Sequence, residues 1–366
     1  QFDVRKYYGY KYIYQTESGK QTAAGYFSSR MANRSLKWEQ TEAFNFGIDF
    51  SIMKGRLFGT VESYLMSTTN LILDRSLPAV TGYGAITTNL GEVQNKGFEV
   101  TLNSNNITKG KFSWDSQLIF YLNRNKIKHL YGTLVDEVNS EGEVIGQKEA
   151  NDYTNNWFID EDIDVIYNYE LNGIWQLSDK EEASKFGLTP GDFKIVDQNG
   201  DGKISPREDK KFLGYSSPRY KMSFVNSFTL FKNFDVSFVL YARLGHYGPN
   251  NRGHIFGGSY GYTYSRFNQY DFPYWTKDNP ENKYSRLDTN NPYGASYYVN
   301  RSFVKLQNFQ VSYTVPSQVL QPYRIQGMRL SVDLQNASTL TSWDLWDPET
   351  SVPTPMIGMF NLNITL

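Results

Sequence analysis

Apolar and polar residues alternate along much of the chain with a period of two, the spacing of a β-strand that has one apolar face. Residues 38–52 give the clearest example. Their alternate positions are apolar on one face and small or polar on the other: Phe44, Phe46, Ile48 and Phe50 against Asn45, Asp49 and Ser51. A strand of about fifteen residues is much longer than the five or six usual in globular proteins. It has the length and the single apolar face that a tilted strand of a membrane β-barrel requires.

The same alternation predicts about eight to ten strands in all. Further examples are residues 98–103, 112–123, 222–231, 234–243, 309–313, 328–335 and 360–366. Short turns are predicted at Lys54–Arg56, Thr108–Lys111 and Lys232–Asn233, and two long connections at residues 128–219 and 244–301. Short turns at one rim and long loops at the other are typical of outer-membrane barrels.

The predicted fold class is therefore all-β, an antiparallel transmembrane barrel with residues 1–366 in one domain. A large soluble β-sandwich or propeller would also alternate. No repeat of about 40 to 50 residues is visible, which disfavours the propeller.

Composition narrows the possible functions. The 366 residues contain 37 basic and 38 acidic side chains, and a chain so balanced lacks the basic face of a nucleic-acid binder. There is no cysteine, which excludes disulfides, thiol catalysis and iron–sulfur ligation. The 28 Tyr, 24 Phe and 7 Trp suit one-sided apolar strands or carbohydrate-binding surfaces. No apolar run is long enough for a membrane-spanning helix.

Residues 197–208, inside the first long connection, fit the calcium-loop pattern D-x-[DN]-x-[DN]-G-x5-E. Gly202 provides the sharp turn that lets alternate oxygens point at one ion. The predicted Ca²⁺ ligands are Asp197, Asn199, Asp201, the Lys203 backbone carbonyl and a bidentate Glu208. A surface turn rich in Asp and Asn without an ion is the alternative. Because no second such loop is present, a bound ion would stabilise this loop rather than sense calcium.

Catalysis finds no support in the sequence, and we expect the chain not to be an enzyme. His129, His246 and His254 match no zinc-protease motif, and no nucleophile elbow, P-loop or dinucleotide fingerprint occurs. The acidic run 160–162 is typical of a solvated loop. The second long connection is rich in Tyr, Gly and Asn, at residues 247–251, 257–262 and 271–280. Such aromatics stack on sugars, grip peptides or pack on one another, so no substrate-binding residue is assigned.

Several motifs, taken in order, resemble those of SusC/RagA-type TonB-dependent outer-membrane transporters. Leu36-Lys37-Trp38-Glu39 with Phe46–Phe50 resembles the family's "LkWE…n.G.D" strand. Residues 89–99 resemble "N.G.v.NkG.E". Residues 172–176, the 190–192 turn, residues 197–208 and the pair Leu213-Gly214 resemble "G.wq…pGD.k..D.NgDG.i…iG". Residues 274–280 and 303–306 resemble "yWt..Np" and "fvrLkn".

The resemblance covers essentially the whole chain and implies the C-terminal part of a barrel of about 22 strands in the outer membrane. It implies an N-terminal plug, energy supplied through TonB, a SusD-like surface lipoprotein as lid, and a dimer of SusC–SusD pairs. The expected function is import of oligosaccharides or oligopeptides, with this chain as barrel wall and extracellular loops, 128–219 and 244–301. About ten strands cannot close in lipid, so another segment of the same protein must supply the rest.

On this interpretation one set of apolar side chains faces lipid: Phe44, Phe46, Ile48, Phe50, Phe234, Val236 and Phe238. Asn45, Asp49 and Ser51 would face the lumen. Two other functions stay open from the residues alone. One is a soluble, calcium-stabilised β-rich glycan-binding module, and the other is a surface hydrolase.

Overall fold

The computed structural model describes residues 8–12, 24–28, 30–77, 79–139, 141–249, 273–287, 289 and 291–366. The chain divides into two compact units. Unit 1 comprises residues 1–45, 64–96 and 124–163; unit 2 comprises residues 46–63, 97–123 and 164–366. No helix in the described part of the chain has the length and apolarity needed to cross a membrane.

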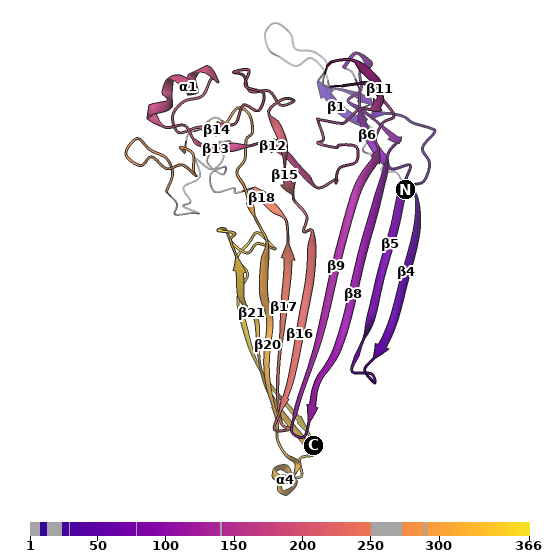
Figure 1. Cartoon of the computed structure of the whole chain (residues 1–366), viewed down its shortest axis with the longest axis vertical. Helices are drawn as coiled ribbons and strands as arrows, with labels where there is room; N and C mark the ends of the chain where they lie inside the picture. Colours follow the sequence, from indigo (N-terminus) through magenta and orange to yellow (C-terminus); the bar gives the residue numbers. More distant parts are fainter. Residues whose placement is uncertain are drawn as a thin grey trace. The chain divides into compact units, whose positions relative to one another are not determined.

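Nine strands are hydrogen-bonded into one sheet in the order β22-β21-β20-β17-β16-β9-β8-β5-β4. Their bounds are β4 Gln40–Ile52, β5 Leu57–Thr69, β8 Glu92–Lys109, β9 Phe112–His129, β16 Tyr220–Leu230, β17 Phe234–Leu244, β20 Phe303–Thr314, β21 Gly327–Thr341 and β22 Ile357–Thr365. Figure 1 shows β16, β17, β20 and β21 running side by side, each antiparallel to its neighbour. The predicted all-β fold with long alternating strands is confirmed.

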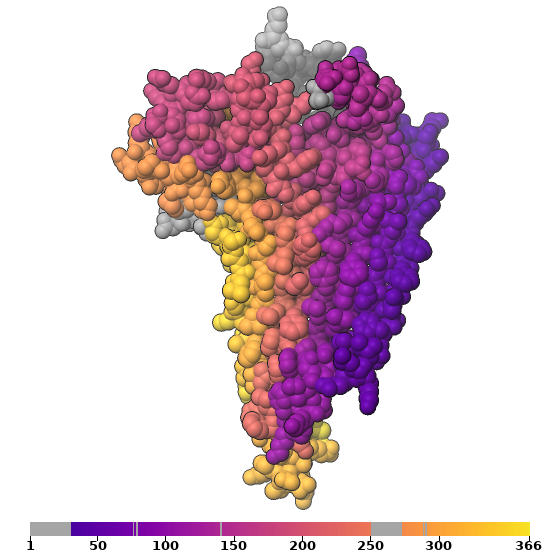
Figure 2. Space-filling view, in the orientation of Figure 1, coloured from indigo at the N-terminus to yellow at the C-terminus, as the bar shows by residue number. Residues whose placement is uncertain are grey.

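In unit 2 the strand register places apolar residues opposite apolar residues on neighbouring strands. One apolar row runs through six strands: Trp114, Phe228, Val236, Val311, Val332 and Phe360. Within this row the rings of Trp114 and Phe228 stack, with centroids 5.7 Å apart. Because a slip of one residue would carry every apolar side chain to the other face, this row fixes the register. Figure 2 shows these late strands, salmon to yellow, as one continuous surface.

The opposite face of the same strands is polar and hydrogen-bonded. Asp235 of β17 accepts a hydrogen bond from Thr229 Oγ1 at 2.9 Å and pairs with Arg329 at 3.1 Å. Asp333 of β21 accepts from Asn361 Nδ2 at 2.6 Å and also from Gln310 Nε2. The sheet therefore has one apolar and one polar face, as the sequence predicts.

Tight turns join consecutive strands of unit 2 at residues 53–56, 110–111 and 231–233. The last turn is one residue longer than predicted, because Leu230 pairs directly with Phe234 and Phe231 belongs to the turn. Phe231 and Lys232 have φ angles of 57° and 73°, the left-handed region that reverses the chain. Residues 315–326 join β20 to β21 and contain the short helices α4, Ser317–Leu320, and η4, Gln321–Tyr323.

Unit 1 contains one end of each of the strands β4, β5, β8 and β9, namely residues 40–45, 64–69, 92–96 and 124–129. It also contains several short elements. These are the hairpins β1 Tyr8–Tyr12 with β2 Ala24–Ser28 and β10 Leu134–Val138 with β11 Val144–Glu149, the sheet of β3 Arg30–Met31, β7 Ala85–Asn89 and β6 Ile72–Ser76, and η2 Ala79–Thr81. Asn89, the first residue of a family-like motif, bridges the backbone: its Nδ2 donates to Lys37 O at 2.8 Å and Asn70 O at 2.9 Å, and its Oδ1 accepts from Lys37 N. This motif residue thus has a structural function.

Unit 2 also contains what we call the loop region, the described residues within 164–216 and 246–300. Its elements are β12 Val165–Tyr169 paired with β15 Lys210–Tyr215, β13 Leu171–Ile174 paired with β14 Phe193–Ile195, β18 Tyr247–Pro249 paired with β19 Tyr298–Asn300, η3 Leu177–Asp179 and α1 Lys180–Lys185. Three small apolar clusters support it, centred on Tyr169, Ile174 and Trp175. The described parts of the two long connections that belong to the loop region are therefore folded.

Candidate functional site

Two segments of the loop region that are distant in sequence contact each other through residues of the family-like motifs. Trp275 is 7% exposed and packs in one cluster with Ile174 and Phe193, and its Nε1 donates to Gln176 Oε1 at 2.9 Å. Gly191 leaves the space that Trp275 needs. It has φ +94°, and a Cβ there would lie 2.6 Å from Trp275 Cε3. The motifs around residues 175, 191 and 275 thus pack together as one motif cluster.

Asp192 is the buried polar residue of this motif cluster. Its carboxylate is almost fully buried and accepts hydrogen bonds from Thr189 N at 2.9 Å, Arg286 Nε at 3.0 Å and Thr289 Oγ1 at 2.6 Å. A buried carboxylate requires such compensation, because an unpaired charge is very costly away from water. Asp192 therefore fixes the position of Arg286 relative to the 189–192 turn.

Side chains of the predicted calcium loop accept hydrogen bonds from the backbone of the same loop. Asp197 accepts from the N–H groups of Gly200 at 2.7 Å and Gly202 at 2.8 Å, Asn199 accepts from Asp201 N, and Asp201 accepts from Lys203 N. These hydrogen bonds hold the loop in a tight turn. The predicted ligands of the first half thus lie on one compact loop.

The second half differs from the pattern. Glu208 accepts from Ser205 Oγ at 3.0 Å, whereas the next residue, Asp209, is 1% exposed and accepts from Gln198 N at 2.8 Å and Ser205 N at 2.6 Å. Sequence reasoning did not single out Asp209. Within the described residues no three acidic or histidine side chains are gathered as an ion site. Calcium at Asp197, Asn199, Asp201, Lys203 and Glu208 stays a prediction of the sequence.

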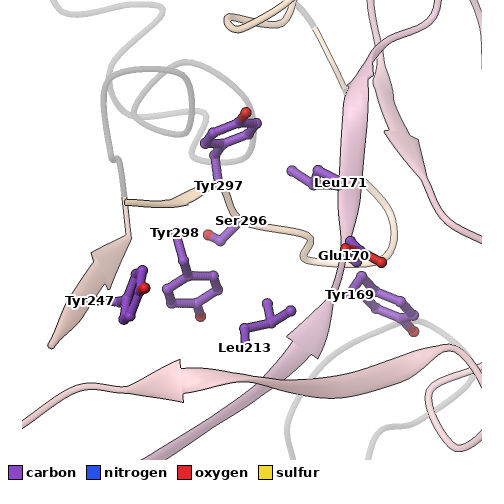
Figure 3. A pocket seen from close by; sticks show the side chains of 8 residues that line it. All are labelled: Tyr169, Glu170, Leu171, Leu213, Tyr247, Ser296, Tyr297 and Tyr298. Carbon is purple, nitrogen blue, oxygen red and sulfur yellow. The ribbon is translucent and has the colours of Figure 1, made fainter. Parts of the chain in front are cut away.

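A small hollow of about 190 Å³ opens between β12, β15, β18 and β19 (Figure 3). We call it the tyrosine hollow; it is lined by Tyr169, Glu170, Leu171, Leu213, Tyr247, Ser296, Tyr297 and Tyr298. In Figure 3 Tyr298 points toward Leu213 beside the ring of Tyr247, whereas Tyr297 points the other way. The Tyr298 hydroxyl accepts from Asn168 Nδ2 at 3.2 Å, which orients the ring. Of these residues the sequence had drawn attention to Tyr247, in the aromatic-rich connection, and to Leu213, in a family-like motif.

The calcium-like loop supports this hollow. Gln198 of the loop donates to Glu170 at 3.2 Å, and Ile204 packs on the cluster of Tyr169, Ile195 and Ala295. The hydrogen bond from Lys211 lowers the pKa of Glu170, and burial raises the pKa of Tyr169. The hollow offers aromatic rings and a paired carboxylate, which can contact one sugar ring or one side chain.

The histidines and acidic residues weighed for catalysis are found apart. His246 is buried beside Phe303, and burial, with Arg301 and Arg243 nearby, lowers its pKa to about 4. His129 lies 3.1 Å from Glu149 in unit 1, and Asp160 pairs with Lys128. His254 and residues 250–272, including the 257–262 stretch, lie outside the described residues.

The side chains predicted to face lipid are largely exposed in this chain. Exposed fractions are 70% for Phe44, 58% for Phe46, 52% for Ile48 and 41% for Phe234. Phe50, Val236 and Phe238 are partly covered. On the other face Asp49 accepts from Thr60 Oγ1 at 2.8 Å. Bulky apolar side chains on an exposed sheet face indicate an apolar surrounding.

Comparisons with known proteins agree with this architecture. The family described as TonB dependent receptor-like, beta-barrel, matches residues 3–144. TonB-dependent receptor P3 of Formosa agariphila is 29% identical over 95% of this chain and 34% of its own length. TonB-dependent receptor SusC of Bacteroides thetaiotaomicron is 25% identical over 91% of this chain and 32% of its own. The chain thus spans about a third of these relatives.

Among solved structures, the RagAB peptide transporter has the same fold. It matches 97% of this chain and 38% of its own chain, with a TM-score of 0.67 and 19% identity. The resemblance drawn from the motifs is therefore confirmed. Residues 3–144 match the TonB-dependent receptor β-barrel family, and nearly the whole chain is similar to a segment of SusC/RagA-like receptors.

Proposed function

We propose that the protein containing this chain imports oligosaccharides or oligopeptides across the bacterial outer membrane with energy from TonB. The sheet carries the proposal: it has long strands, one continuous apolar face and a polar opposite face. Its relatives are named TonB-dependent receptors, and the solved structure of the same fold is described as a peptide transporter. In this function the apolar face contacts lipid and the polar face lines the lumen.

The sheet edges support a larger barrel. Strands β4 and β22 stand at the two ends of the nine-stranded order. In lipid, the unpaired N–H and C=O groups of an open edge would each be costly. We therefore propose that another segment of the same protein supplies the remaining strands and a plug, through which TonB acts.

The loop region would form extracellular loops that meet a SusD-like lipoprotein lid, in a dimer of such pairs. Its role would be to hold substrate rather than to convert it. The residues that line the tyrosine hollow include no nucleophile paired with a base, so we propose no enzymatic step for this chain.

The test is uptake by cells of the source bacterium that lack the gene. Deletion should abolish uptake of at least one labelled oligosaccharide or oligopeptide, and loss of TonB should have the same effect on that substrate. Unchanged uptake of every substrate in a broad panel would refute import. Co-purification with a lipoprotein from detergent extracts of the outer membrane tests the lid.

The alternative, a soluble calcium-stabilised glycan-binding module, follows from the 197–208 motif and the aromatic content. Fractionation distinguishes the two. A transporter remains in the outer membrane and needs detergent, whereas a soluble module of 42.2 kDa needs none.

A further inference from the structure

A second cavity in the loop region, of about 570 Å³, is larger than the tyrosine hollow. It lies between η3 and α1 on one side and the 274–287 segment on the other. We call it the lysine pocket; its lining includes Leu177, Lys180, Tyr274, Lys277, Arg286 and Leu287. Its volume is within the range of small-molecule sites.

The lining is cationic. It contains two lysines and an arginine but no aspartate or glutamate. Lys180 and Lys277 are both exposed, and neither forms an ion pair or a side-chain hydrogen bond with any residue that the structure describes. The buried carboxylate of Asp192 is used by Arg286, Thr289 and Thr189. The pocket thus presents positive charge to whatever enters it.

Two side chains that line the pocket, Arg286 and Trp275, are held by hydrogen bonds, and the backbone that carries Lys277 is held in a turn. Arg286 is anchored through Nε on Asp192, and Trp275, which also lines the pocket, is anchored on Gln176. Lys277 projects from a tight turn closed by two hydrogen bonds between Thr276 and Asn279, at 3.0 and 3.1 Å. Arg286 is therefore held in place before an anion binds, whereas the exposed side chains of Lys180 and Lys277 become ordered when it binds.

The remaining lining is apolar or aromatic. Tyr274 is 38% exposed and Leu177 is 51% exposed, so both offer surface to a ligand. Aromatic rings stack on the C–H faces of sugars. No lining residue belongs to a strand, so the pocket offers no edge to which an extended peptide could add as a strand. These features favour an acidic sugar over an acidic peptide.

We propose that the lysine pocket binds a uronate residue of an acidic oligosaccharide, with the carboxylate near Lys180 and Lys277 and the ring on Tyr274. This rests on the proposed import function and narrows its substrate class to glycans that carry carboxylates. Ammonium–carboxylate contacts in a partly enclosed site are stronger than neutral hydrogen bonds.

Calorimetric titration of the full-length receptor with hexa-galacturonate, maltohexaose and hexa-glutamate tests the proposal. The unsubstituted receptor should bind hexa-galacturonate at least about tenfold more tightly than the other two. Lys180→Ala with Lys277→Ala should weaken that binding at least about tenfold, and the corresponding Arg pair should retain it. The control Lys128→Ala with Lys148→Ala removes the same charge from ion-paired lysines of unit 1 and should leave the affinity unchanged.

Three results would overturn the proposal: no binding of hexa-galacturonate to the unsubstituted receptor, equal binding by the double alanine variant, or tight binding of hexa-glutamate alone. None of them refutes import, because the gene-deletion assay measures import independently. If deletion abolishes uptake while pocket variants behave like the parent, the proposed function stands and the pocket assignment fails.

Discussion

Trp275 Nε1 donates a hydrogen bond to Gln176 Oε1 at 2.9 Å and thereby joins two motifs that are 99 positions apart in the chain. The same indole covers Gly191, whose backbone conformation and lack of a side chain make the contact possible. Their arrangement holds two long connections together as one folded region, which bears both cavities.

Gly191→Ala should disrupt this region. An added Cβ would lie 2.6 Å from the Trp275 ring, and φ is +94°. Left-handed backbone alone costs a residue with a Cβ roughly 1–2 kcal/mol, and overpacking adds about 1–3 kcal/mol. Hydrogen exchange of residues 171–195 in the full receptor should show faster opening.

Gly187→Ala is the matched control, because Gly187 has φ +69° and no neighbouring atom within 4 Å of the point that an added Cβ would occupy. It should cost only the backbone strain. Equal exchange rates in the two variants would show that contact with Trp275 does not restrict position 191.

The sheet follows from the sequence because its signal is local. Alternation in β4, β17 and β22 predicts strands whose ends lie within three residues of the observed bounds. The errors occur at turns: Phe231 ends the predicted strand 222–231, yet it lies in the turn because Leu230 pairs with Phe234. In hairpins the turn geometry, and not hydrophobicity, sets the last paired residue.

The loop region could not be derived in the same way. Its strands are short, such as the three residues of β14, and short strands carry little periodicity. The motifs marked positions such as Asp192 and Trp275, but their partners come from tertiary contacts that no local pattern specifies. Asp209 was missed for the same reason, since its burial depends on Gln198 and on the fold around the loop.

Lys305→Ala should loosen the connection between β21 and β22. Lys305 is 4% exposed and its Nζ lies 2.8 Å from both Asp347 and Glu349. Removing one partner of a buried ion pair costs about 3–5 kcal/mol; here Asp347 loses its ammonium partner, whereas Glu349 keeps Arg243 at 2.9 Å. Proteolysis within residues 342–356 should accelerate. Adding Asp347→Asn and Glu349→Gln should restore part of the resistance; no restoration would mean that packing by the lysine stem is what matters.

Ile48→Arg should impair barrel assembly in the membrane. Ile48 is 52% exposed on the face assigned to lipid, where an arginine near the midplane costs roughly 2–4 kcal/mol. Heat-modifiable migration on gels measures the folded fraction. Asn45→Arg, on the opposite face of the same strand, should fold like the parent, and normal folding of both variants would contradict the assignment of faces.

His246 should make the folded state sensitive to mild acid. Burial lowers its pKa from 6.5 to about 4, so the unfolded chain binds a proton before the folded chain does. Stability is therefore full above pH 6.5 and falls between pH 6.5 and 4, by at most about 3 kcal/mol. Carboxylates titrate in the same range, so the informative quantity is the difference between the parent and His246→Asn. That difference should shrink by this amount as the pH falls, and a constant difference would show that His246 is not buried as a neutral group.

The 197–208 motif predicts that calcium slows opening of its loop and of the tyrosine hollow. Gln198 and Ile204 connect the loop to Glu170 and to the Tyr169 cluster, so an ion there should protect residues 165–171 from hydrogen exchange as well. Chelation with EGTA should reverse the protection. Asp201→Ala should abolish it, because that variant removes a predicted ligand and the acceptor of the hydrogen bond that Lys203 N donates. The control Asp136→Ala, on β10, should leave the protection by calcium unchanged. Protection that is independent of calcium in the parent would mean that the hydrogen bonds of Asp197 and Asp209 suffice to hold the loop.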